Sequence, residues 1–250
     1  MKKVIIVGYG NIGQKLYKEY EKLNPDIYDP YKGFDKKDTY YDFAFVCVDT
    51  PLGDDGNCDL SQVIKAITDT EADIIVLRST VPPNTTDKLI EETGKRIVFS
   101  PEFYGVTQHS SSESFDFNFT ILGGVKEWSY KVVQLLQNVY DGRHKFCITE
   151  SKIAELSKYM ENTLLAAKVS VCAQFYMIAK QLGIGYEEVR ELVLQDPRIN
   201  RSHTFVYEDH PYWKSHCFDK DLRVISNQFN ADFIRSIIDF NEICKNKNIL

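Results

Sequence analysis

The chain has 250 residues, of which 43% are hydrophobic and 26% are charged, a balance that excludes a disordered or fibrous protein. Its formal net charge of −6 and the lack of a basic tract argue against a nucleic-acid-binding surface, which needs clustered lysine and arginine. Its apolar runs are far too short to cross a bilayer, which takes about 20 residues.

The N-terminus and the cysteines indicate the compartment. Met1-Lys2-Lys3 leads directly into a predicted strand, which is not the pattern of a signal peptide, and the six cysteines include no C-x-x-C pair. We therefore expect a cytoplasmic protein with reduced thiols and no metal site of the zinc or iron–sulfur type.

The first predicted elements are a strand, a glycine-rich loop and a helix. The apolar run at residues 4–7 is typical of a strand buried on both faces, and a helical pattern covers residues 14–23. The glycines between them form a G-x-G-x-x-G fingerprint, which permits a tight turn, close approach of a pyrophosphate, and packing of the helix on the strand. The residues that we assign to cofactor binding in this loop are Gly8, Gly10, Asn11, Ile12 and Gly13.

A second short strand, at residues 26–28, ends in Asp29. An acidic side chain about 20 residues beyond the loop fits hydrogen bonding to the adenine ribose hydroxyls and would repel a 2′-phosphate. The sequence therefore predicts NAD rather than NADP. The alternative is a glycine turn in an unrelated α/β fold.

Strands and helices continue to alternate through the next hundred residues. We predict strands at residues 43–48, 74–77 and 96–99, and a helix at residues 60–70. This order predicts a Rossmann-type, doubly wound parallel sheet. Thr50, Thr80 and Glu102 follow the ends of strands, where such folds bind ligands, although each alone is more often a cap or a turn residue. A polar segment at residues 107–118 is interpreted as a mobile lid or a solvated insertion.

No glycine or proline interrupts residues 150–182, and apolar residues recur there at helical spacing, which predicts one long helix. Because about 30 helical residues span about 45 Å, we expect this helix to build a second domain or a homodimer interface. We assign residues 1–149 to an NAD-binding domain and 150–250 to a small all-α central or dimerisation domain. Glu155 is expected on the exposed face, and the pattern alone favours surface positions for Lys158 and Asn162.

Near the C-terminus, residues 215–222 bring a cysteine together with charged side chains. If a helix begins near Cys217, the thiol lies at the positive end of the helix dipole and shares one face with Asp221. His216 and Lys220 add titratable or positive charge, which favours the nucleophilic thiolate. The alternative is that Cys217 is a small buried hydrophobic residue.

Taken together, these segments resemble the UDP-glucose/GDP-mannose dehydrogenase family along the whole chain. Beyond the glycine loop, the motifs that carry the resemblance lie at residues 46–52, 59–61, 79–82, 100–103, 154–162, 196–199 and 217–222. The resemblance implies an enzyme that oxidises the primary alcohol of a nucleotide sugar, or of a sugar, to the acid in two NAD-dependent steps.

The resemblance also implies roles for individual residues. Cys217 matches the family's nucleophile, which holds the substrate first as a thiohemiacetal and then as a thioester. Lys158 and Asn162 match the pair that stabilises the developing oxyanion, one by its charge and the other by an amide N–H.

Further matches concern water and substrate. Asp221 and Thr80 match residues that position or deprotonate water, and Glu102 matches the acid–base group of thioester hydrolysis. Arg198 matches an arginine that often reaches the substrate of a neighbouring subunit, and Lys220 is assigned to the substrate with it.

The chain also departs from the family pattern. Within the residues up to Leu250 we expect no counterpart of the second nucleotide-binding domain with which full-length members hold UDP, and bulky residues stand at 212–216, where the family has glycines. Val106 and Gln174 stand where the family has glutamates. Two alternatives therefore remain, an impaired NAD-binding protein that needs a partner and a single-step β-hydroxyacid-type dehydrogenase that does not need Cys217.

Overall fold

The computed structural model of the chain describes residues 2–103 and 118–246, and these residues form two compact units. Among them, the first unit comprises residues 2–53, 58–103 and 118–158, and the second comprises 54–57 and 159–246. The polar segment expected at 107–118 lies outside the described residues, apart from Asn118.

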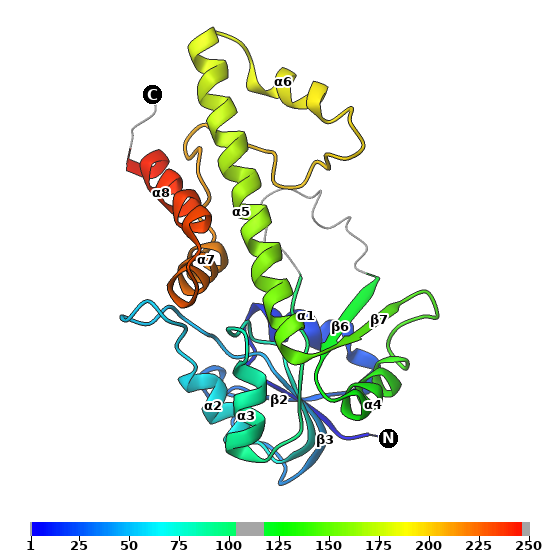
Figure 1. Ribbon diagram of the computed structural model, residues 1–250. Coiled ribbons are helices and arrows are strands. Elements are labelled where there is room, and N and C mark those ends of the chain that lie inside the picture. The colour runs from blue at the N-terminus through cyan, green and yellow to red at the C-terminus, as the bar shows by residue number, and fades with distance from the viewer. Residues whose placement is uncertain (1, 104–117, 247–250) are drawn as a thin grey trace. The chain divides into compact units, whose positions relative to one another are not determined.

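The first unit is built on a sheet whose described strands follow the order β2-β1-β3-β4-β5-β6-β7 (Figure 1). Neighbouring strands run parallel, except that β5 and β6 are antiparallel. The strands are β1 Val4–Val7, β2 Asp26–Tyr28, β3 Tyr41–Val46, β4 Ala72–Leu77, β5 Ile97–Phe99, β6 Phe119–Gly123 and β7 Lys145–Thr149. The predicted Rossmann-type α/β fold is therefore confirmed.

Helices cover both faces of this sheet, which explains why its central strands are continuously apolar. On one face, α1 (Asn11–Glu19) and α4 (Lys126–Leu136) bury Leu16 and Val132. On the other face, α2 (Ser61–Thr68) and α3 (Thr85–Thr93) bury Ile67 and Leu89. Full burial of one such side chain contributes about 1.5–3 kcal/mol.

The first helix differs from the expected residues 14–23. It begins at Asn11 because Gly10 is its N-cap, and Gln14 N–H donates to Gly10 O at 3.0 Å. The helix ends at Glu19, and a short 3-10 helix η1 (Glu21–Leu23) follows before the chain turns at Asn24, whose φ is 46°. A second 3-10 helix, η2 (Pro30–Lys32), follows β2.

The second unit contains most of α5 (Ser151–Leu182), with α6 (Tyr186–Val193), α7 (His216–Gln228) and α8 (Asp232–Asn246). Figure 1 shows α7 and α8 side by side, and both pack on α5. Their shared core consists of Ala166, Trp213, Phe218, Leu222, Ile237 and Ile238. No helix in the described part of the chain is long and apolar enough to span a membrane.

The long helix expected at residues 150–182 is confirmed by α5. The compact units divide within this helix, after Lys158, rather than before it. The first turns of α5 belong to the sheet unit because Ala154 packs in the core beneath α2 and α3. The division of the chain into domains at residue 149 stays a prediction.

The expectation that Glu155 is exposed was wrong, since its exposed fraction is 0%. Its Oε1 accepts hydrogen bonds from the N–H and hydroxyl of Thr86, at 2.8 and 2.6 Å, and its Oε2 accepts from Asn84 N–H at 2.7 Å. These donors lie at the start of α3, where N–H groups lack intrahelical acceptors. Burial raises the pKa of Glu155, and the three hydrogen bonds oppose that rise. Helical periodicity shows which residues share a face but not what that face meets.

Replacing Glu155 with glutamine should lower the free energy of unfolding by about 1–3 kcal/mol, because the amide NH₂ would leave a buried donor of α3 without an acceptor. Urea unfolding at neutral pH measures this difference. The control is Glu150→Gln, at an exposed position, which should change the same quantity by less than about 0.5 kcal/mol. Equal stabilities of the two variants would contradict the capping role of Glu155.

Candidate functional site

The glycine loop between β1 and α1 is shaped by steric contacts. Gly8 has φ of +91°, and a Cβ added there would lie 2.9 Å from the carbonyl group of Cys47. A Cβ on Gly13 would lie 2.0 Å from Gly8 O, so the first turn of α1 can close on the loop only at a glycine. At Gly10, by contrast, no heavy atom lies within 4 Å of the Cβ position. The loop therefore leaves no space for a side chain at Gly8 and Gly13, whereas the position beside Gly10 is empty.

The start of α1 fits an anion at this opening. Asn11 and Ile12 are its first residues, and N–H groups at such positions have no intrahelical acceptor. The first turn carries no acidic side chain that would repel a phosphate. Together with the space at Gly10, this arrangement fits the pyrophosphate of a dinucleotide.

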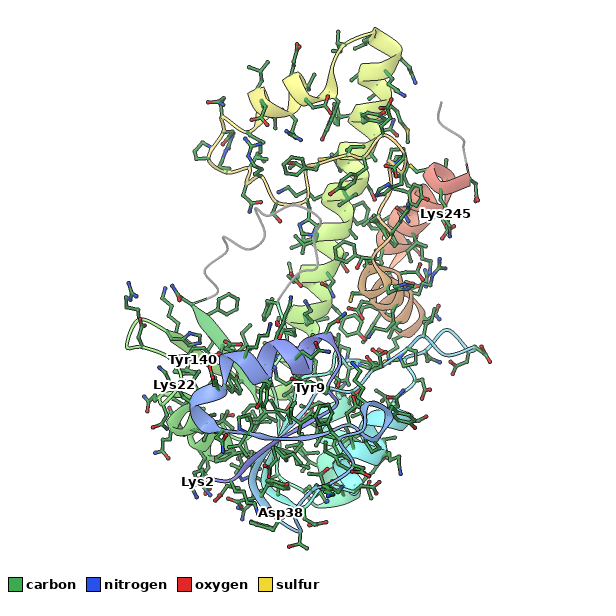
Figure 2. The ribbon with its side chains drawn as sticks, turned by 180° about the vertical axis from the view of Figure 1, so that it is seen from behind. Lys2, Tyr9, Lys22, Asp38, Tyr140 and Lys245 are labelled. Carbon is green, nitrogen blue, oxygen red and sulfur yellow. The ribbon has the colours of Figure 1, made fainter. Side chains whose placement is uncertain are left out.

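Asp29 lies beside the same loop, at the end of β2. Its Oδ2 accepts a hydrogen bond from the N–H of Tyr9 at 2.8 Å, and Figure 2 labels Tyr9 near α1. Lys32 Nζ donates to Tyr9 O at 2.8 Å, a contact that the sequence interpretation missed because no motif indicates it. The carboxylate of Asp29 is thus held at the glycine loop, and its contact with the ribose hydroxyls stays a prediction.

Hydrogen bonds join the loops that follow β3 and β4. Thr50 Oγ1 donates to Thr80 O at 2.9 Å, and Ser79 Oγ donates to Val48 O at 2.6 Å. The expectation that Thr50 and Thr80 lie at one edge of the sheet is therefore confirmed, and their roles stay predictions.

Glu102, which follows β5, forms a buried ion pair that the sequence interpretation missed. Arg78 donates to Glu102 Oε2 at 2.6 Å and to Ser100 Oγ at 2.7 Å, and the charged side chains are 7% and 6% exposed. Burial disfavours the charge of Arg78, but Glu102 and neighbouring groups outweigh it and raise the pKa of the guanidinium. The sequence does contain a signal for this pair, because Arg78 directly follows an apolar strand and an arginine buried there needs a counter-ion. Both side chains line a small cavity with Glu19 and Tyr140, and Figure 2 labels Tyr140.

Lys158 is not a surface residue, since it is only 8% exposed. Its Nζ lies 5.0 Å from the centre of the Phe103 ring, within range of a cation–π interaction. Lys158 stands one turn after Glu155 on α5, so the hydrogen bonds from the start of α3 to Glu155 fix the part of α5 that carries this cation.

In the second unit, the helix start expected near Cys217 is confirmed, because α7 begins at His216. Ser215 is its N-cap and accepts a hydrogen bond from Phe218 N–H at 3.5 Å. Cys217 is exposed in the first turn, whereas Asp221, one turn further along, is only 1% exposed.

Asp221 is held by two of the residues that the sequence singled out. Asn162 Nδ2 donates to Asp221 Oδ2 at 2.6 Å, and Lys220 Nζ lies 2.9 Å from Asp221 Oδ1. Asn162 is 4% exposed, so it is not a surface residue either. Arg198, in contrast, lies in the segment after α6, where its 86% exposed side chain pairs with Asp196 at 2.6 Å.

The thiols differ in their surroundings. Cys47 and Cys244 are buried, whereas Cys147 and Cys217 are exposed. Burial raises the pKa of Cys47 to about 12, so this thiol stays protonated at neutral pH. Exposure in the first turn of a helix favours Cys217 over Cys47 as a nucleophile.

Comparisons with known proteins found two domain matches in this chain. The NAD binding domain of the UDP-glucose/GDP-mannose dehydrogenase family matches residues 30–142, and the family's central domain matches residues 152–243. The glycine loop and Asp29 precede the first matched range, so the dinucleotide site rests on its own geometry.

Two relatives and one solved structure illustrate the similarity. The UDP-N-acetyl-D-mannosamine dehydrogenase of Methanococcus vannielii is 29% identical over 212 residues, which are 80% of this chain and 48% of the relative. The UDP-glucose 6-dehydrogenase of Rickettsia prowazekii is 26% identical over 222 residues, which are 81% of this chain and 50% of the relative. The chain thus spans about half the length of these relatives.

The structure of a UDP-glucose dehydrogenase from Pyrobaculum islandicum superimposes with a TM-score of 0.79 at 21% identity, and covers 97% of this chain and 68% of that one. At this identity the likeness concerns the fold. With both domain matches in sequence order, the chain belongs to the UDP-glucose/GDP-mannose dehydrogenase family, and NAD is the cofactor of its N-terminal domain.

Proposed function

We propose that the chain is an NAD-dependent dehydrogenase that oxidises the primary alcohol of a UDP-sugar to a carboxylic acid. The observation that carries this proposal is the arrangement on α7. An exposed Cys217 lies in the first turn, and a buried Asp221 on the same helix is hydrogen-bonded to Asn162. The names of the relatives supply the class of small-molecule substrate.

The residues of the first unit fit NAD. The open space at Gly10 and the N–H groups at the start of α1 would hold the pyrophosphate, and Asp29 would hold the adenine ribose. Thr50 and Thr80 are further candidate contacts. When bound, NAD accepts a hydride in each of the two oxidations.

Cys217 supplies the covalent chemistry in this proposal. Its Sγ bonds to the carbon of the aldehyde left by the first oxidation, and the product is a thiohemiacetal. Loss of a second hydride and a proton leaves a thioester on Sγ. Water then adds to the thioester carbon, the C–S bond breaks, and the acid leaves as the thiol is restored.

The remaining roles follow the family resemblance. Lys158 and Asn162 stabilise the negative oxygen of the tetrahedral species. Asp221 and Thr80 position or deprotonate the water, and Glu102 transfers a proton during hydrolysis. Lys220 is a candidate cation for binding the substrate. Arg198 is a candidate cation for binding the substrate of a neighbouring subunit.

Replacing Cys217 with serine should reduce acid formation about 1,000-fold or more, because a serine hydroxyl does not form the thioester. NADH is measured by absorbance and the product by mass spectrometry, and the wild type should form two NADH per acid. Cys147→Ser is the control, because Cys147 is also exposed but lies on β7.

Other outcomes of this assay favour the two alternatives. One NADH per substrate with activity retained in Cys217→Ser would indicate a single-step dehydrogenase. NAD binding without turnover of any sugar nucleotide would indicate an impaired protein that needs a partner.

The variant Gly10→Ala should fold normally and lose NAD affinity, because its Cβ enters space that is open in the protein but reserved for the pyrophosphate. Thermal unfolding with and without NAD measures both effects. A ligand at one hundred times its dissociation constant adds about 2.7 kcal/mol, and a tenfold loss of affinity removes about 1.4 kcal/mol. Gly142→Ala, at a turn with equal space, is the control. An equal NAD effect in both variants would contradict the assignment.

We also propose that the chain forms a homodimer through α5. Apolar side chains on this helix face outward with exposed fractions of 53–67%, at Met160, Leu164, Val171, Phe175 and Leu182. Their spacing of four and seven residues places them on one stripe. A two-fold axis across the stripe would cover the same apolar surface on both copies.

Replacing Leu164 with aspartate should give a monomer, because the dimer would bury a charge without a partner. Size-exclusion chromatography with light scattering measures the mass. Lys180→Asp, away from the stripe on the same helix, is the control and should stay dimeric. A wild-type chain with the mass of a monomer would rule out the dimer.

A further inference from the structure

The segment that leads into α7 is anchored by a buried tryptophan. Trp213 is 6% exposed, and its ring meets that of Phe218 edge-on, with 6.2 Å between the ring centres. Trp213 lies four residues before Cys217 and Phe218 directly after it, so one core joins the chain on both sides of the thiol. The family resemblance indicated only that bulky residues stand here in place of glycines.

Asn241 of α8 holds Trp213 by its backbone. Asn241 Oδ1 accepts a hydrogen bond from Trp213 N–H at 3.0 Å, and Asn241 Nδ2 donates to Trp213 O at 3.2 Å. Asn241 is only 5% exposed, so water cannot easily replace these bonds. Two bonds from one amide fix both the position and the orientation of the Trp213 backbone.

The side chain of Trp213 makes a separate attachment to α5. Its indole Nε1 donates to Ser170 Oγ at 3.2 Å, and Ser170 Oγ donates in turn to Ala166 O at 3.1 Å. The backbone of Trp213 is therefore fixed by α8 and its ring by α5. These two attachments can be removed independently.

The anchored backbone lies close to the thiol in the chain. Lys214 alone separates Trp213 from Ser215, the N-cap of α7, and Cys217 follows in the first turn. Loss of the Asn241 bonds would leave the Trp213 N–H and C=O buried and unpaired, which favours local movement of this segment.

We propose that Asn241 is a positioning residue, which holds the first turn of α7 and hence Cys217 in place through the backbone of Trp213. The consequence for turnover rests on the proposed role of Cys217 as the nucleophile. The consequence for the local structure does not.

The test compares three variants of the full chain. Asn241→Leu removes both bonds to the Trp213 backbone at similar volume. Trp213→Phe keeps those bonds and removes the indole N–H together with part of the buried ring. Ile238→Ala removes packing from α8 in the same core without touching either attachment.

The first measurement is amide hydrogen exchange without cofactor or substrate. We expect peptides that cover residues 213–220 to exchange at least about ten times faster in Asn241→Leu than in the wild type. In Trp213→Phe and Ile238→Ala, they should exchange no faster than the rest of α7 and α8. Unchanged exchange of these peptides in Asn241→Leu would overturn the proposal.

The second measurement is steady-state turnover of a UDP-sugar with NAD. We expect kcat of Asn241→Leu to fall about 10- to 100-fold while KM for NAD stays unchanged, because a small displacement of the reacting atom is costly. Trp213→Phe should keep kcat within about twofold. Equal losses of kcat in Asn241→Leu and an equally destabilised Ile238→Ala would overturn the proposal.

If the wild type shows no turnover, the proposed function fails, and the exchange measurement alone decides the role of Asn241. If Asn241→Leu does not fold, Asn241→Asp takes its place, since it retains the acceptor for Trp213 N–H and loses the donor to Trp213 O. The same local increase in exchange is then expected, and its absence overturns the proposal.

Discussion

A buried carboxylate at the start of α5 holds together the edge of the first unit that carries its candidate residues. Glu155 accepts three hydrogen bonds from the start of α3, which follows the loop bearing Thr80. One turn later, the same helix carries Lys158. The carboxylate of Glu155 therefore fixes the loop of Thr80 and the backbone of Lys158 relative to one another. Without these hydrogen bonds, burial of the carboxylate would cost several kcal/mol.

Other buried polar groups in the chain follow the same physical rule. Arg78 and Glu102 neutralise one another at the end of the sheet, and Asn162 and Lys220 both contact the carboxylate of Asp221. Such pairs are costly to break, so each holds its members in one geometry. In a catalyst, this rigidity lowers the reorganisation that the reacting groups need.

The parts of the fold that local pattern determines were predictable from the sequence. Apolar runs rich in β-branched residues indicate the buried strands. Gly8 and Gly13 mark positions where a Cβ would collide with the backbone. The start of α7 near Cys217 was also predictable, because Ser215 is a good N-cap. The burial of Glu155 and the contact of Asn241 with Trp213 were not, because each depends on partners that lie 28 to 71 residues away in the chain. Nor does periodicity reveal that the apolar stripe of α5 faces outward, because that depends on which residues the other helices cover.

The central claim is that a substrate carbon becomes bonded to Sγ of Cys217 during turnover. The most direct test mixes the full chain with NAD and UDP-glucose or UDP-N-acetylmannosamine, quenches the reaction in acid at early times, and maps the peptides by mass spectrometry. We predict the mass of the bound sugar nucleotide on the peptide that contains Cys217 when NAD is present, and no such mass without NAD. Accumulation of the acid product while this peptide stays unmodified at every time point would contradict the account.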